Sequence, residues 1–226
     1  MIWQDKGYLL SKNKYNENSL ISEFYTLNHG KISGVIFGAT SKKIKNYLLI
    51  GNEFHINFSS NREGKSGYFN LEIENINTPK YLNDIKKLNC IIYSMNLIRS
   101  LTVENQKNIN IFYLIDDLYK ILNDNDWLIN FIFWELNFFK NIGYDINFSD
   151  YVKSVFIDGS EKFIVESSKK IIPSFLVDKN IIPKNDFDIF DGFKVVGDFL
   201  EKTILRPNNL SYPISRTEFI NSIKRI

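Results

Sequence analysis

The chain of 226 residues contains little cysteine and little histidine. Its single cysteine, Cys90, excludes a disulfide within the chain and a zinc site made of several thiolates. Its two histidines, His29 and His55, have no cysteine, histidine or carboxylate at the spacing of a metal ligand set. Cys90 lies in an apolar stretch, which predicts a packed hydrophobic side chain rather than a nucleophile. We therefore expect no metal and no cofactor.

Catalytic motifs and long apolar runs are also missing. The sequence has no glycine-rich phosphate loop, no Gly-x-Ser-x-Gly motif and no dinucleotide fingerprint. Its apolar runs are much shorter than the roughly 18 residues of a membrane span, and residues 1–5 do not resemble a secretion signal. We expect a cytoplasmic protein that is not an enzyme. The alternative is an enzyme that uses Glu135 or Asp116 as its acid or base.

Positive charge is concentrated near the N-terminus. Residues 1–80 carry ten Lys and Arg against seven Asp and Glu, whereas the remainder carries eighteen against nineteen. The net charge of +2 does not by itself indicate a nucleic-acid partner. Lysine, asparagine and isoleucine are abundant throughout, as expected from an AT-rich genome, so distribution matters more than the total.

The first third of the chain predicts a small β-barrel. Short runs of β-branched and aromatic residues alternate with turn formers, and Asn28 to Gly30 and residues 61–65 are the clearest turns. The expected strands cover residues 6–12, 20–27, 31–37, 54–59 and 68–74. Five strands with an insertion after the third are typical of an OB-fold, although an SH3-like barrel fits nearly as well.

After Thr78 and Pro79 the apolar period changes to that of helices. We expect helices over residues 81–103, 108–123, 126–142, 192–205 and 215–225. Gly143 is placed to end the third helix in a left-handed cap. The segment 145–190 is irregular, with weak strands around residues 155–157 and 162–166. The predicted fold is thus α+β: an OB-fold barrel over residues 1–78, then an α-helical domain over residues 79–226 with a small irregular insertion.

A basic loop follows the third expected strand. No acidic residue occurs between Glu23 and Glu53, so the lysines of this stretch are not locally compensated, as contact with DNA phosphates requires. A solvated lysine loop is the alternative interpretation. The candidate DNA-binding residues are Lys12, Lys14, Lys31, Lys42, Lys43, Lys45, Arg62 and Lys65. The aromatic residues that could stack on bases are Tyr8, Phe37, Tyr47, Phe58 and Tyr68.

Several motifs resemble the RecO family of recombination mediators. Residues 15–19 form a Tyr-x-Glu-x-Ser box and residues 24–30 a Phe-x-Thr-x-x-His-Gly turn. The loop 41–45, followed by Leu48 to Gly51, is similar to the family's arginine-rich loop, with lysines in place of arginines. Residues 134–144 and 211–223 resemble two later helices of the family. The resemblance covers nearly the whole chain and is strongest over residues 1–52.

The resemblance implies a bacterial, nucleoid-associated protein of DNA repair and recombination. Such a protein binds single- and double-stranded DNA, contacts RecR and the C-terminal tail of the single-strand-binding protein, anneals strands and helps to load RecA. We expect a lysine-flanked apolar groove of the helical domain to take the acidic tail. An adaptor that joins proteins without touching nucleic acid is the alternative.

The chain departs from the resemblance at the family's zinc site. Many members have four cysteines after the Leu-Gly-Tyr helix, but Tyr151 and Ser154 stand near the first pair here. We therefore expect the family zinc site to be lost. We expect Phe156, Phe163 and Ile164 to hold this segment together as a small apolar cluster.

Overall fold

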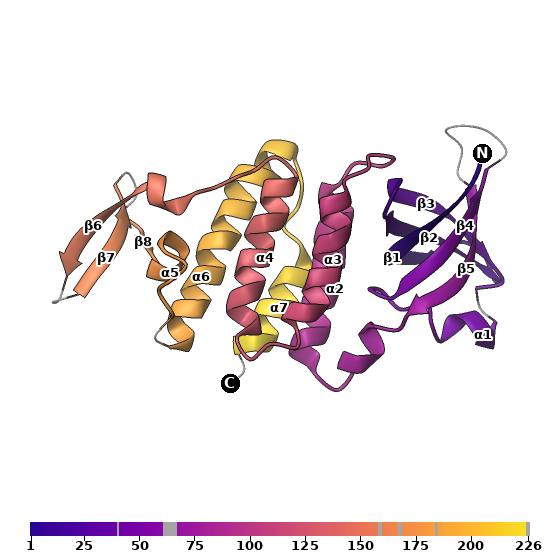
Figure 1. Cartoon of the computed structure of the whole chain (residues 1–226), viewed down its shortest axis with the longest axis horizontal. Coiled ribbons are helices and arrows are strands. Elements are labelled where there is room, and N and C mark those ends of the chain that lie inside the picture. The colour runs from indigo at the N-terminus through magenta and orange to yellow at the C-terminus, as the bar shows by residue number, and fades with distance from the viewer. Residues whose placement is uncertain (40, 61–66, 158–159, 167–168, 184, 225–226) are drawn as a thin grey trace. The chain divides into compact units, whose positions relative to one another are not determined.

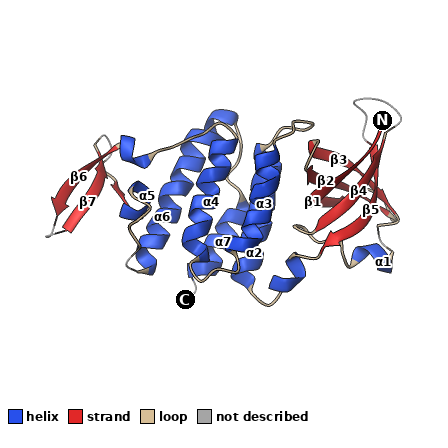
Figure 2. Ribbon diagram, in the orientation of Figure 1, coloured by secondary structure: helices blue, strands red, loops and turns tan. Residues whose placement is uncertain are grey.

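The protein forms two compact units. The computed structural model describes residues 1–226 except 40, 61–66, 158–159, 167–168, 184 and 225–226 (Figure 1). The first unit comprises Met1–Leu122 with Pro213–Ile226, and the second comprises Asn123–Tyr212. Strands occur in the barrel of the first unit and in a small sheet of the second (Figure 2). No helix among the described residues has the length and apolar character needed to cross a membrane.

The N-terminal strands close into a barrel. Its strands are β1 (Ile2–Lys14), β2 (Ser19–Thr26), β3 (Gly30–Phe37), β4 (Glu53–Ser59) and β5 (Gly67–Asn75), in the order β1-β2-β3-β5-β4. All neighbours are antiparallel except β3 and β5, and β1 closes the barrel against β4. The short helix α1 (Lys42–Lys45) lies in the insertion between β3 and β4. The predicted OB-fold is confirmed.

The barrel interior is filled by aromatic and aliphatic side chains. Leu9, Phe24, Phe54 and Phe69 are each nearly inaccessible to solvent. Phe24 meets both Phe54 and Phe69 edge to face, with ring centroids 5.8 and 5.0 Å apart. Alternation along each strand places these rings inside, because successive side chains point to opposite faces of a sheet.

Three long helices complete the first unit. They are α2 (Ile85–Leu101), α3 (Ile109–Ile121) and α7 (Ile214–Lys224), and the short 3₁₀ turn η1 (Thr78–Tyr81) precedes them. The Asp84 carboxylate caps α2 by accepting hydrogen bonds from the backbone N–H groups of Lys86 and Lys87. Helix α2 packs against both β1 and α7.

The second unit pairs two helices and carries a small sheet. Helix α4 (Trp127–Asn141) packs against α6 (Asp186–Phe199), which continues into the π-helical segment η3 (Leu200–Leu205) and the 3₁₀ turn η4 (Arg206–Asn208). Strands β6 (Val152–Ile157), β7 (Ser160–Val165) and β8 (Ile171–Ile172) form an antiparallel sheet in that order. The turn η2 (Phe148–Asp150) precedes this sheet and the short helix α5 (Ser174–Val177) follows it. As predicted, Gly143 has a positive φ, +95°, and it follows Ile142, the C-cap of α4.

The helices are distributed between the two compact units. The predicted boundary at residue 78 falls between the end of β5 and α2, where the barrel gives way to helices. By compactness, however, α2, α3 and α7 belong with the barrel, whereas α4 to α6 form the other unit. The scheme of two domains, 1–78 and 79–226, therefore stays a prediction.

The expected apolar cluster in the segment 145–190 does not form. Phe156 is 80% exposed, and it pairs across the hairpin with Glu161. Phe163 pairs with Ser154, so it shares the face of Phe156, whereas Ile164 is the next residue and points to the opposite face. The prediction was wrong because it ignored this strand alternation.

Candidate nucleic-acid interface

One end of the barrel gathers the lysine-rich segments. Lys14 at the end of β1 pairs with Leu20, and Phe37 at the end of β3 pairs with Ser19. The backbone N–H of Ala39 donates a 3.1 Å hydrogen bond to the carbonyl of Asn18, which ties the start of the α1 insertion to the β1–β2 turn. This end of the barrel, with the ends of β1 and β3, the starts of β2 and β5, and α1, is called the cationic end below.

Two exposed aromatic rings lie side by side at the cationic end. Phe37 and Tyr68 are 60% and 44% exposed, with ring centroids 6.0 Å apart at 52°. They share this place because β3 and β5 run parallel here, with Val35 paired to Tyr68. Of the other predicted stacking candidates, Tyr47 is exposed, whereas Tyr8 and Phe58 are buried and cannot stack on a base.

Lys14 and Lys45 are accessible cations of this end. Both are exposed, and neither forms an ion pair within the part of the chain that the structure describes. Lys42 and Lys43 lie with Lys45 in α1. The backbone of the insertion thus brings three of the predicted lysines to the end where Lys14 emerges.

Lys12 is partly withdrawn from this surface. Its ammonium group donates a hydrogen bond to the carbonyl of Leu48, and its side chain is half-buried. Burial lowers the pKa of the Lys12 ammonium, and the nearby charge of Lys45 lowers it further. Lys12 therefore fixes the insertion to β1, in addition to any contact with a ligand.

Lys31 lies apart from the other candidates, at the opposite end of β3. Its ammonium group donates a 2.7 Å hydrogen bond to the carbonyl of Arg99. Burial lowers the pKa of Lys31, although the carboxylates of Glu23 and Glu104 act in the opposite direction. Since Glu23 also binds Arg99, the charge around Lys31 is locally compensated. The structure does not bring Lys31 together with the cationic end, and its contact with DNA stays a prediction.

Two further candidates fall in the segment 61–66. Arg62 and Lys65 lie outside the described residues, so their predicted role is not addressed by the structure. One exposed ring was missed by sequence reasoning: Tyr15, next to Lys14, is 59% exposed. Its place in the tight β1–β2 turn, where its N–H donates to the carbonyl of Ser19, could have indicated its exposure.

A second group missed by sequence reasoning is built on His29. Its imidazole stacks on Trp3 with centroids 4.0 Å apart, and its Nδ1 lies 2.8 Å from a carboxylate oxygen of Asp5. The buried Asp5 carboxylate also accepts hydrogen bonds from the backbone N–H and side-chain amide of Asn28. His29 is a turn residue, as expected, and its contacts make it an anchor between β1 and the β2–β3 turn.

Asp116 and Glu135, the two acids considered for catalysis, are each held within the packing of the fold. Asp116 accepts a hydrogen bond from the Tyr8 hydroxyl, and burial together with this bond raises the pKa of Tyr8. Glu135 is fully buried within α4. Neither residue lines the pocket that the structure describes in the second unit.

The residues at the family's zinc position do not fit a zinc site. Tyr151 is exposed, and the Ser154 hydroxyl donates a hydrogen bond to Glu161. The single cysteine, Cys90, is buried in α2 of the first unit. Among the described residues, no group of three His, Cys, Asp or Glu side chains is arranged to hold a metal ion.

Comparisons with known proteins relate both parts of the chain to recombination proteins. Residues 1–76 match the family model described as Recombination protein O N terminal, and residues 82–180 match Recombination protein O C terminal. A DNA repair protein RecO from Ehrlichia chaffeensis is 27% identical over 151 residues, which cover 66% of this chain and 61% of the relative. RecO from Rhodopseudomonas palustris is 25% identical over 100% of this chain and 97% of the relative. RecO from Rhodospirillum rubrum is 22% identical over 99% and 96%.

Proposed function

The chain belongs to the RecO family of DNA repair proteins, and on that premise we propose that it binds single- and double-stranded DNA through its cationic end. One observation carries this proposal: the same end of the barrel presents both exposed, uncompensated lysines and exposed aromatic rings. The lysines are Lys14 and Lys45, and the rings are those of Phe37 and Tyr68. Lysines attract phosphates irrespective of sequence, and aromatic rings stack on unpaired bases.

This surface suits strand annealing. Two complementary strands repel each other through their phosphates, and lysines that neutralise those phosphates reduce the repulsion. Contacts with the phosphates and stacking on the faces of the bases both leave the base edges available for pairing. Annealing in this way needs no bond to be made or broken by the protein, which agrees with a mediator that is not an enzyme.

The proposed cellular role is recombination mediation with protein partners. The chain would act with RecR, contact the acidic C-terminal tail of the single-strand-binding protein, and assist the loading of RecA. Family membership supports these partners. The lysine-flanked apolar groove expected to take the acidic tail stays a prediction. We also propose that the chain works without zinc, since Tyr151 and Ser154 replace two ligands.

Replacing Lys14 and Lys45 together with alanine tests the DNA interface. Each phosphate contact on single-stranded DNA contributes about 0.7 to the slope of log affinity against log salt, so the double variant should lose about 1.4 of that slope. The measurement is fluorescence anisotropy of a labelled oligonucleotide at several salt concentrations. The same variant should anneal strands coated with single-strand-binding protein more slowly.

The matched control replaces Lys120 and Lys224 with alanine. Both are exposed lysines of the first unit on helices α3 and α7, so the change in net charge is identical. The control should keep the slope of the unmodified protein. If the Lys14 and Lys45 variant also keeps it, the cationic end is not the DNA site.

A further inference from the structure

Strand β6 is the outermost strand of the small sheet in the second unit. The strand order is β6-β7-β8, so one edge of β6 pairs with β7 and the other edge has no neighbouring strand among the described residues. Within the same part of the chain, no backbone hydrogen bond joins β6 to any segment other than β7. The N–H and C=O groups of the outer edge are therefore left for water or for another extended chain.

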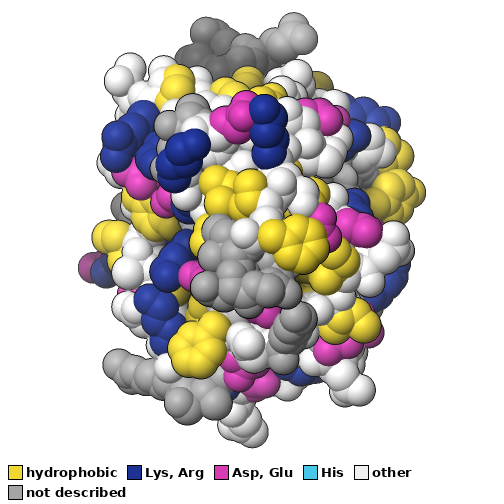
Figure 3. Space-filling model, turned by 90° about the vertical axis from the view of Figure 1, so that its left-hand side faces the viewer, with side chains coloured by type: hydrophobic (Ala, Val, Ile, Leu, Met, Phe, Trp, Pro, Cys, Tyr) yellow, Lys and Arg dark blue, Asp and Glu magenta, His cyan; other side chains and the backbone are white. Residues whose placement is uncertain are grey.

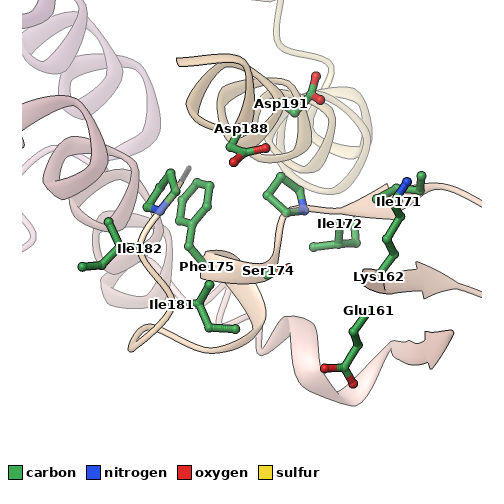
Figure 4. A pocket seen from close by; sticks show the side chains of 12 residues that line it. Glu161, Lys162, Ile171, Ile172, Ser174, Phe175, Ile181, Ile182, Asp188 and Asp191 are labelled. Atoms are coloured by element: carbon green, nitrogen blue, oxygen red, sulfur yellow. The ribbon is translucent and has the colours of Figure 1, made fainter. Parts of the chain in front are cut away.

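The opposite side of the sheet is anchored to the helices of the unit. Ile172 of β8 is buried and pairs with Phe163 of β7, and with Phe175 of α5 it lines a pocket of about 320 Å³ (Figure 4). The Phe175 ring in turn meets Phe133 of α4 edge to face at 6.1 Å. Strand β6 is thus part of a preformed sheet, and a chain that adds to it does not first have to order it.

The outer edge of β6 lacks the features that protect exposed edges. Natural sheets discourage pairing at an edge with a proline, a β-bulge or an unpaired charge. Strand β6 has no proline, and its pairing with β7 continues without a shift from Val152 to Ile157. Its one charged side chain, Lys153, forms an ion pair with Glu166. The edge is therefore open to a further strand.

A large apolar side chain stands beside this edge. Phe156 is 80% exposed, and by strand alternation it shares one face of the sheet with Ser154 and Val152. Figure 3 shows hydrophobic side chains among charged ones on the face of the molecule that carries this sheet in Figure 1. An exposed aromatic ring next to an open edge gives an added strand an apolar contact as well as backbone hydrogen bonds.

We propose that the chain forms a dimer in which a second copy adds its own β6, antiparallel, to this edge. The two sheets then continue into one another, as in other cases of strand addition. Identical strands that pair antiparallel are related by a two-fold axis, so every favourable contact forms twice.

The side chains of β6 favour one register. With Ser154 on the axis, Phe156 of each copy lies directly opposite Val152 of the other, and such aromatic and β-branched pairs stabilise antiparallel strands. Lys153 then lies opposite Val155, so like charges do not face each other. A shift by one residue would place Phe156 opposite Lys153 and put the two Phe156 rings on opposite sides of the sheet.

The inference goes beyond the proposed function, because the contact involves neither DNA nor a different protein. A dimer would carry two cationic ends, one from each copy. Its benefit for strand annealing rests on the proposed function, whereas its existence is tested without DNA.

Sedimentation velocity of the full chain tests the dimer. One added strand is a small interface, so we expect a dissociation constant of about 10 to 100 µM. Phe156→Asp removes an exposed ring that the monomer does not need, and it should weaken the dimer at least about tenfold. The matched control is Phe187→Asp on α6, where the ring is 79% exposed, and it should leave the dimer intact. A chain that stays monomeric at about 300 µM, or equal weakening by both variants, would overturn the proposal.

A cysteine at the axis tests the register. Directly opposite residues of antiparallel strands have Cα atoms about 4.5 to 5.5 Å apart, within the reach of a disulfide. Ser154→Cys should therefore give a covalent dimer after mild oxidation, seen on a non-reducing gel. Ser149→Cys, at another exposed serine of the same unit, should not, and the native Cys90 is buried. Equal crosslinking of the two variants, or none in either, would contradict pairing through β6.

Discussion

At the scale of single residues, Glu53 shows how the barrel alters an ionisable group. This first residue of β4 is buried, and its carboxylate accepts a hydrogen bond from the Asn75 side chain. Burial raises the pKa of Glu53, the bond from Asn75 opposes the shift, and the neighbouring charge of Asp116 adds to it. The ionised form is thus disfavoured in the folded protein relative to the unfolded chain.

We expect Glu53→Gln to remove the cost in folding stability that comes from ionising a buried carboxyl. A carboxyl whose pKa is raised on folding contributes stability below its unfolded pKa, and that stability is lost as the pH rises through the folded pKa. Glutamine stays neutral, so the variant should gain stability relative to the unmodified protein between pH 4 and pH 7. Urea unfolding at both pH values measures the difference.

Glu72→Gln is the control for this pH dependence. Glu72 is exposed on the neighbouring strand β5, opposite His55. Because Glu72 is exposed, its replacement should not give the stability advantage expected from removing the buried carboxyl of Glu53. An advantage of Glu53→Gln that is the same at pH 4 and pH 7 would show that ionisation of Glu53 costs nothing.

At the cationic end, the sequence predicted which residues could contact DNA, but it did not predict the exposure and contacts of each side chain. Nothing in the sequence separates Lys14, which is exposed, from Lys31, whose ammonium group binds the Arg99 carbonyl. That carbonyl is 68 residues away along the chain, and only the packing of α2 brings it near. Likewise, Tyr8 and Tyr68 both lie on strands, yet one is buried against α3 and the other is exposed.

At the scale of elements, local patterns predicted most strands and helices. The five barrel strands and the helices around residues 81–142 were found because alternation and helical periodicity depend on neighbouring residues. Helix α6 was the main error, since it begins at Asp186 rather than near residue 192. The Asn185 side chain caps it by accepting from the N–H of Asp188 at 3.1 Å, and Gly192 lies inside the helix.

Two glycines of the insertion after β3 share a strained backbone conformation but differ in what an added side chain would contact. Gly38 and Gly51 both have positive φ, +66° and +89°, but a Cβ at Gly38 would meet nothing within 4 Å. A Cβ at Gly51 would lie 2.5 Å from the Tyr119 hydroxyl and 2.8 Å from Cγ2 of Ile91. Gly51 is thus the point at which the insertion contacts helices α2 and α3.

We expect Gly38→Ala to lower the free energy of unfolding by about 1 kcal/mol, the cost of a left-handed backbone alone. Gly51→Ala should cost about 2 to 4 kcal/mol, because overpacking adds to that strain. Urea denaturation of both variants gives the comparison. Equal losses would mean that the structure around Gly51 yields without cost.

At the scale of the whole molecule, α7 returns to the unit in which the chain began. Phe219 stacks on Tyr93 of α2 with ring centroids 6.1 Å apart, and the buried Arg216 donates a 3.2 Å hydrogen bond to the Tyr93 hydroxyl. Sequence reasoning predicted α7 as a helix but not its partner. A contact across 123 residues leaves no local pattern to detect.

Phe219→Ala should loosen α2 selectively. Removing a buried aromatic ring from this contact costs about 3 to 5 kcal/mol, and the loss should fall on the first unit. Hydrogen exchange followed by mass spectrometry should show faster exchange in α2 and unchanged exchange in α6. The exposed neighbour Glu218→Ala should leave both helices protected, and equal loss of protection in α2 and α6 would contradict the division into units.

Because α7 belongs to the first unit but is translated last, it determines when that unit can finish folding. A ribosome that has made residues 1–122 has delivered the barrel, α2 and α3, but the Tyr93 ring still lacks its cover. The second unit, Asn123–Tyr212, is contiguous and can fold as soon as it emerges. The barrel unit must wait until α7 is translated. A nascent chain that stalls before residue 213 would therefore carry a first unit in which the Tyr93 ring is left without Phe219.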